Sequence, residues 1–141
     1  MSKRPRPLTT TGGSDEREGR SMTAPLLRFD LAEEAARLRT EAEYLDGDRN
    51  AKTLAKAGAF RVVLVAFRLG ATFDENDQRG SVAVHVLEGR LALRVGQHEI
   101  EIREGEVAVI PAEHRWTAVA LADGLLLMNL SWPPDPGDVG T

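Results

Sequence analysis

The chain has 141 residues, of which 42% are hydrophobic and 28% are charged. This length leaves room for one domain, and the composition is ordinary for a globular protein. The formal net charge of -4 gives no electrostatic reason for a nucleic-acid partner. No apolar run is long enough to cross a membrane, no signal peptide is recognisable, and the lack of cysteine excludes disulfides and thiolate sites. We therefore expect a cytoplasmic protein with neither nucleic acid nor membrane as a partner.

The two ends of the chain differ in composition from its middle. Residues 1–28 begin with a stretch that is rich in Pro, Thr and Gly and lacks any apolar period. Residues 133–141 hold three prolines and two glycines. Neither segment can bury much apolar surface, so we expect two flexible tails around one domain at residues 29–132. One hypothesis is that translation begins at Met22, where the apolar patterning starts, instead of at Met1.

An amphipathic helix is predicted for residues 31–45. Asp30 and Glu33 have the spacing of a capping box, in which the first side chain accepts from free backbone N–H groups. Asp46 and Gly47 end the helix. One apolar stripe recurs every three or four residues through Leu31, Ala35, Leu38, Ala42 and Leu45. We expect this stripe to lie on a larger body.

The period changes after Ala59 to that of β-strands. Residues 60–69 are almost continuously apolar, which is typical of a strand covered on both faces. Shorter strands are predicted at residues 81–87, 90–95, 98–102, 106–110, 116–120 and 125–132, with glycine-containing turns between most of them. This regular spacing indicates an all-β sandwich or barrel.

Several stretches carry a resemblance to a known family. Residues 86–91 read VLEGRL, Gly96 follows, and residues 103–106 and 109–111 read REGE and VIP. Upstream, residues 48–54 (DRNAKTL) and 61–64 (RVVL) look like the lead-in of one bacterial subset. Over residues 29–132 the chain resembles a small single-domain bacterial cupin of the RmlC-like superfamily. The resemblance implies an all-β double-stranded β-helix, or jelly-roll barrel, whose interior usually holds a metal or a small ligand.

The metal-binding part of the cupin pattern is missing. Metal-binding cupins carry a His-x-His pair before the VLEG hairpin and another His beyond the Pro of the second motif. Here residues 74–80 read DENDQRG, and Trp116 stands at the place of the last ligand. An indole donates only and cannot coordinate a metal. We therefore expect a metal-free cupin without a cofactor.

Six residues are candidates for a small-molecule site. Trp116, Phe67 and Met128 are expected in the barrel lumen, with His85 facing either the lumen or the opposite sheet. His114 and Arg115 are expected at the mouth, in the loop after Pro111. Each also has a plainer interpretation, since Trp116 can simply fill the core, His85 can be a packed structural histidine and His114 can be an ordinary loop residue.

Two further groups carry charge. Arg49 and Lys52 follow the helix and could bind an anion or a carboxylate across a subunit interface, or form a solvent-facing pair. Asp74, Glu75 and Asp77 offer oxygen ligands for a hard cation, but they lack the spacing of a calcium loop, so a solvated turn is expected.

Two functions remain open. The leading hypothesis is a metal-free cupin that binds a small organic molecule in the lumen, or that serves as a structural homodimer through its sheet edges, residues 31–45 and residues 48–56. The alternative is a metal-dependent dioxygenase or isomerase in which His85, His114 and an acid from residues 74–77 converge. A tightly filled interior favours assembly, and an empty apolar cavity favours ligand binding.

Overall fold

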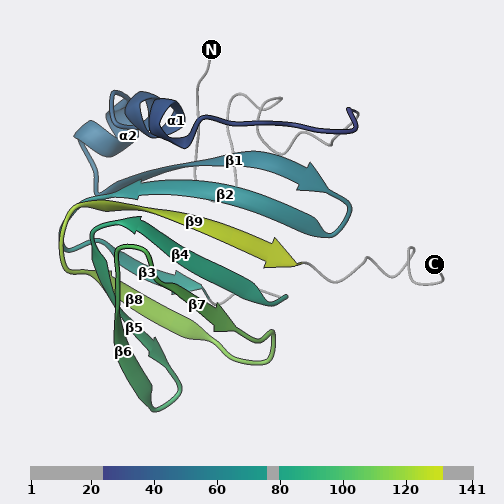
Figure 1. Ribbon diagram of the computed structural model, residues 1–141. Helices are drawn as coiled ribbons and strands as arrows, with labels where there is room; N and C mark the ends of the chain where they lie inside the picture. The colour runs from purple at the N-terminus through teal and green to yellow at the C-terminus, as the bar shows by residue number, and fades with distance from the viewer. Residues whose placement is uncertain (1–23, 76–79, 132–141) are drawn as a thin grey trace.

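A computed structural model describes residues 24–75 and 80–131 (Figure 1). Residues 1–23 and 133–141 of the two expected tails lie outside the described residues, as do residues 76–79 of the acidic loop. The elements are α1 (Leu31–Leu38), α2 (Ala42–Leu45), β1 (Arg49–Ala57), β2 (Phe60–Phe67), β3 (Thr72–Glu75), β4 (Val82–Glu88), β5 (Arg90–Val95), β6 (His98–Arg103), β7 (Val107–Ile110), β8 (Trp116–Ala120) and β9 (Gly124–Ser131). Within these ranges no helix is long and apolar enough to span a membrane.

The strands form two antiparallel sheets that face each other (Figure 1). The five-stranded sheet has the order β1-β2-β9-β4-β7, and the four-stranded sheet has the order β3-β8-β5-β6. The crossed order of the strands is that of a jelly roll, as predicted. The strands predicted from residue 60 onward are all present, with ends that differ by at most two residues from the expected ones.

The helical region differs from the prediction of one helix over residues 31–45. The structure has two helices, α1 and α2, separated by residues 39–41. Asp30 caps α1 as expected, because its Oδ1 accepts from the Glu33 N–H at 3.1 Å. The break follows from Asn50 on β1, whose side-chain amide donates to the Leu38 carbonyl at 2.9 Å and so satisfies a group at the end of α1.

Two strands were not predicted. β1 lies at the edge of the five-stranded sheet and pairs with β2, with a register shift between Thr53 and Ala55. Its sequence, RNAKTLAKA, consists mostly of Asn, Lys and Ala, which have weak strand propensity, so the apolar pattern does not reveal it. β3 pairs with β8 and includes Asp74 and Glu75. These two acidic residues therefore lie in a strand and not in the solvated turn that was expected.

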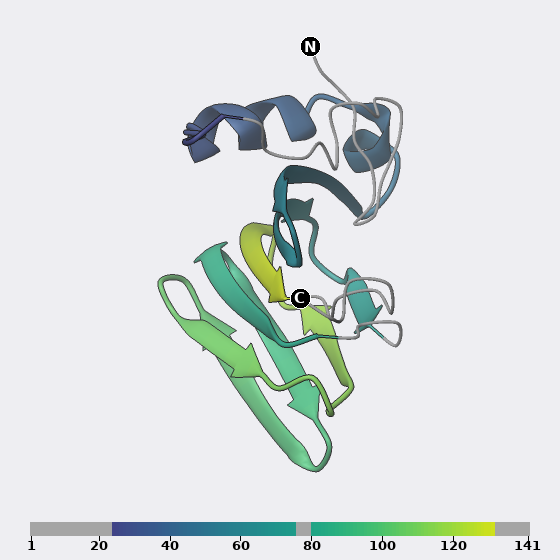
Figure 2. The ribbon, with the colours of Figure 1, turned by 90° about the vertical axis from the view of Figure 1, so that its right-hand side faces the viewer.

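Two apolar clusters hold the layers together. The larger lies between the sheets and takes the inward residues of the strands, including Val65 of β2 and Leu91 of β5. The smaller lies on the outer face of β2 and β9, where Leu64, Ala66 and Leu125 pack against Leu38 of α1 and Tyr44 of α2. Figure 2 shows both helices on the β1–β2 side of the molecule. β2 is therefore covered on both faces, as its unbroken apolar sequence predicts.

Candidate functional site

Three of the candidate residues lie in the core between the sheets. Trp116 begins β8, Phe67 ends β2 and Met128 lies on β9, and each is at most 3% exposed. Phe67 also packs edge-to-face against Phe73, with ring centroids 6.0 Å apart. A side chain that borders a void of water size retains exposed surface, so these residues fill the lumen instead of lining an opening. The filled interior favours the assembly hypothesis over ligand binding in the lumen.

The structure corrects the expectation that His85 belongs to a lumen or mouth site. Val84 and Val86 point inward on β4, so strand alternation turns His85 to the outer face of the five-stranded sheet. It lies there half-buried, opposite Leu127 of β9 and Val107 of β7. It is therefore separated from Trp116 by the sheet itself.

His114 and Arg115 lie in the loop between β7 and β8 and are exposed. The loop is tightened by a bond from the His114 N–H to the Pro111 carbonyl at 3.1 Å. It joins the end of β7 to the start of β8, at the end of the barrel where β2 and β4 begin and β9 ends. This is the right-hand end of the barrel in Figure 1.

Arg49 and Lys52 do not form a joint anion site. Three residues apart on β1, they point to opposite faces of the strand. Arg49 lies 4.4 Å over the Phe73 ring and donates to Asp48 and to the Thr72 carbonyl. Lys52 binds Glu34 of α1, with 2.8 Å between Nζ and Oε1. Lys52 thus holds α1 against β1, and Arg49 holds β3 against β1.

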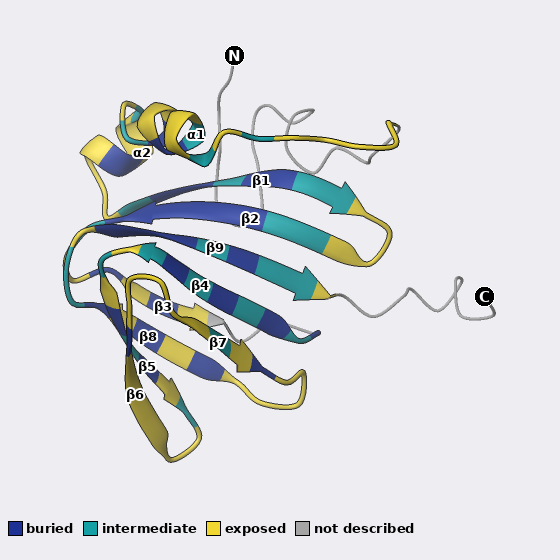
Figure 3. Cartoon of the chain, viewed as in Figure 1, coloured by how far each residue is buried: buried dark blue, intermediate teal, exposed yellow. Residues whose placement is uncertain are grey.

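An exposed apolar surface on the five-stranded sheet was not predicted. Helices α1 and α2 cover the outer face over β1, β2, part of β9 and the end of β4 at Leu87. Among the residues that the structure describes, no helix covers β7 and the rest of β4 (Figure 3). On β7, Val107 is 56% and Val109 is 70% exposed. We call this surface the valine face and define it by the adjoining outward residues of the three strands: Ala83, His85, Val107, Val109, Leu127 and Asn129. The sequence feature that could have revealed this surface is residues 107–110 (VAVI), because neither face of this strand is polar.

The outer face of the four-stranded sheet is charged in contrast. Glu101 of β6 accepts from Arg90 at 3.1 Å and from Arg103 at 3.2 Å. The hydrogen bond from Arg90, together with the weaker influence of Arg103, lowers the pKa of the Glu101 carboxyl below its ordinary value. Because the network is exposed, it makes that face polar and solvated.

Known proteins identify the architecture. No family model and no curated protein matches the sequence. The fold is similar to that of KdgF from Halomonas sp. (23% identity, 62% of this chain and 82% of that chain, TM-score 0.57). It is also similar to an RmlC-like cupin from Shewanella frigidimarina NCIMB 400 (22% identity, 65% and 81%, TM-score 0.56). Salicylate 1,2-dioxygenase from Pseudoaminobacter salicylatoxidans matches over 74% of this chain but 32% of its own (16% identity, TM-score 0.62).

The two facing antiparallel sheets thus define an all-β jelly roll. More particularly, the domain has the cupin fold, which the sequence resemblance implies. The matched structures include both cupins named only by their superfamily and an enzyme, so the fold by itself does not assign an activity.

The described residues do not fit the metal that this fold often holds. The alternative ligand set needs His85, which points out of the barrel. Trp116, at the position to which the resemblance assigns the last ligand, carries an indole, which donates only. Asp74 of that set is exposed on β3. In residues 24–75 and 80–131, no three His, Asp or Glu side chains lie close enough to hold a metal ion.

Proposed function

We propose that this chain is a metal-free, non-enzymatic cupin that works as a structural homodimer, with the valine face at the centre of the interface. The single observation that carries the proposal is the exposure of Val107 and Val109 at 56% and 70% on a sheet whose other half is covered by helices. The filled lumen supports it, because the interior leaves little room for a substrate.

A second copy of the chain is the occupant that best fits the valine face. The face holds no Asp, Glu, Lys or Arg, although 28% of the chain is charged. In a two-fold interface the same surface meets itself, so a charge near the axis would lie close to its own copy. Nucleic acid and lipid headgroups are bound through cations, which the face lacks.

The β7 edge of the five-stranded sheet is a second argument for another copy of the chain as the partner. β7 pairs with β4 on one side, and none of the described strands pairs with its other side. An uncovered edge with exposed valines is an aggregation hazard unless another surface covers it. A stable interface covers about 800 Å² on each partner, so the valine face would form its centre and the β7 edge its margin.

The oligomeric state of the full chain tests this proposal. Light scattering after size-exclusion chromatography is expected to give a dimer for the native chain and a monomer for Val109→Glu. The matched control is Val119→Glu, because Val119 is 42% exposed on the outer face of the other sheet. Circular dichroism and thermal unfolding check that both variants fold. A native chain that stays monomeric at tens of micromolar would overturn the proposal.

Cross-linking gives a second readout, independent of stability. The chain has no cysteine, so each single-cysteine variant carries one thiol. Val107→Cys and Val109→Cys are expected to form covalent dimers under mild oxidation, and Val119→Cys is not. Equal yields from all three variants would mean that random collisions produce the bond.

A further inference from the structure

We propose that His85 makes the homodimer depend on pH, so that the two copies separate when the imidazole takes up a proton. The inference rests on the proposed homodimer, because His85 belongs to the valine face. It adds regulation by acid to that interface, and the experiment below separates its failure from a failure of the homodimer.

His85 lies in the middle of the valine face. On β4 it is directly opposite Val107 of β7 and Leu127 of β9. Along its own strand, Ala83 and Leu87 share its outward direction. The imidazole is half-buried among these apolar side chains in the single chain. A second copy on the valine face would remove much of its remaining contact with water.

The neighbouring strands bring no unpaired carboxylate to this imidazole. β7 and β9 contain no charged residue. Glu88, at the end of β4, is paired with Arg39 at 3.0 Å. Glu106, which precedes β7, accepts from the Arg103 N–H at 2.8 Å. Among the described residues, no hydrogen bond or ion pair joins the His85 ring to another side chain.

The helix side of the sheet adds two more charged residues. The segment that leads into α1 packs Phe29 into the cluster that borders Leu127, and it carries Arg28 and Asp30 on either side. Arg28 is a cation and would oppose a second positive charge. Asp30 is the N-cap of α1. A protonated His85 would therefore enter the interface without a carboxylate of its own in the described part of the chain.

Proton uptake then opposes association. A charged group that moves from water into an apolar contact without a partner is strongly disfavoured. Each dimer would bury two imidazoles, one from each copy, and both must be neutral. The dimer therefore binds fewer protons than two separate chains, and a falling pH shifts the equilibrium toward separate chains. An imidazole changes its charge between about pH 5 and 8, which is where the effect is expected.

The dissociation constant of the dimer at two pH values tests the inference. Sedimentation equilibrium of the full chain, at matched ionic strength, is expected to give a Kd at least about tenfold higher at about pH 5.5 than at about pH 8. Circular dichroism checks that the chain is folded at both pH values. A dimer with the same Kd at both would overturn the pH dependence and leave the homodimer standing. A chain that is monomeric at both would overturn the homodimer and this inference with it.

His85→Gln is the decisive variant, because glutamine is polar but takes up no proton. Whatever its absolute Kd, this variant is expected to have nearly the same Kd at the two pH values, and His85→Leu repeats the comparison with an apolar side chain. The matched controls are His98→Gln on β6 and His114→Gln in the loop after Pro111, since both of these histidines are exposed and lie outside the valine face. Both controls are expected to keep the native pH dependence. A native pH dependence in His85→Gln would show that another group is responsible.

Discussion

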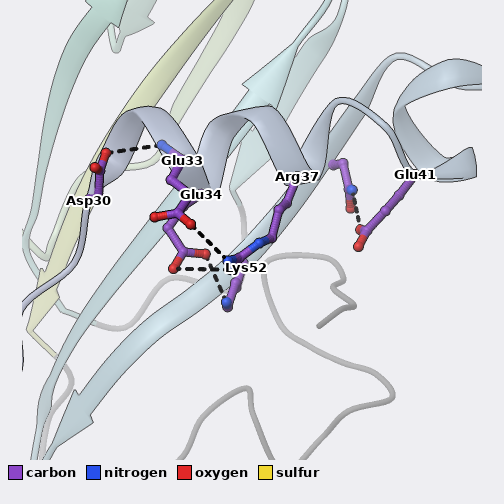
Figure 4. Close-up of polar contacts among 7 residues, drawn as sticks. Asp30, Glu33, Glu34, Arg37, Glu41 and Lys52 are labelled. Atoms are coloured by element: carbon purple, nitrogen blue, oxygen red, sulfur yellow. Dashed lines mark hydrogen bonds and ion pairs between the residues drawn. The ribbon is translucent and has the colours of Figure 1, made fainter. Parts of the chain in front are cut away.

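Lys52 of β1 and Glu34 of α1 form an ion pair at 2.8 Å, with side chains that are only 19% and 13% exposed (Figure 4). Arg37 of the same helix lies 3.8 Å from the Glu34 carboxylate and 3.1 Å from Glu33. Together with the apolar cluster below α1 and the hydrogen bond from Asn50 to the Leu38 carbonyl, this pair connects the helix to the edge strand. It therefore helps to hold α1 over its half of the sheet.

We expect the Lys52–Glu34 pair to contribute measurably to stability. A double-mutant cycle of Lys52→Gln and Glu34→Gln, followed by urea unfolding, is expected to give a coupling of about 1–2 kcal/mol, between the values for exposed and buried pairs. Arg94 and Glu99 are the control, because they lie 3.7 Å apart and are 62% and 61% exposed. Their coupling is expected to be below about 0.5 kcal/mol. Equal coupling energies for the two pairs would show that burial does not strengthen the Lys52–Glu34 interaction.

The buried Asn50 is expected to be the more sensitive contact between helix and strand. Its amide nitrogen donates to the Leu38 carbonyl at 2.9 Å and to the Glu41 carboxylate at 2.8 Å. Asn50→Asp removes both donors and brings a second carboxylate to Glu41, so we expect a loss of about 2–4 kcal/mol in urea unfolding at pH 7. The loss should shrink at pH 4, where the new carboxyl becomes protonated. A loss that does not depend on pH would contradict this account.

The sequence predicts the strands whose apolar residues form the core. It does not predict an element that is held in place by polar side chains. β2 and the strands β4 to β9 have apolar faces that the core requires, so their positions could be predicted. β1 is held by Asn50 and Lys52 under a helix, and these side chains carry no strand signal. The orientation of His85 depends on the register of β4, and a shift by one residue exchanges the two faces.

The same limit applies to the candidate sites. Trp116, Phe67 and Met128 could be predicted as inward residues because they lie on apolar strands. The valine face depends on how far the helices reach over the sheet, which is a property of the packed structure.

The Glu101 network is expected to stabilise the fold slightly at neutral pH and to lose this contribution in acid. Because its pKa is lowered in the folded chain, Glu101 stabilises the fold above the pKa of the unfolded chain. The stabilisation is lost as the pH falls through the folded pKa. Arg90→Gln removes the largest cause, so the Glu101 carboxyl is expected to titrate closer to its ordinary pKa in an NMR titration. Arg94→Gln should leave it nearly unchanged, and an equal rise in both variants would contradict the assignment to Arg90.

Trp116 is expected to be a core residue whose loss destabilises the whole barrel. It is 2% exposed and lies between Val95 of β5 and Glu75 of β3 in the register. Trp116→Ala is expected to cost about 3–5 kcal/mol in chemical unfolding, because it leaves a large cavity. Val119→Ala, three positions along β8 and on the opposite face, is expected to cost less than about 1 kcal/mol. A mild effect of Trp116→Ala would instead indicate an indole that borders open space.

Trp116→His tests whether the domain is one substitution away from a metal site. The variant places an imidazole where the resemblance puts the last ligand, but His85 on the outer face of β4 cannot join it. We therefore expect that Zn²⁺ or Ni²⁺ raises the Tm of Trp116→His no more than that of Trp116→Gln, which cannot restore a strong metal ligand. A selective rise in Trp116→His would mean that other donors converge at this point, and the metal-free proposal would then fail.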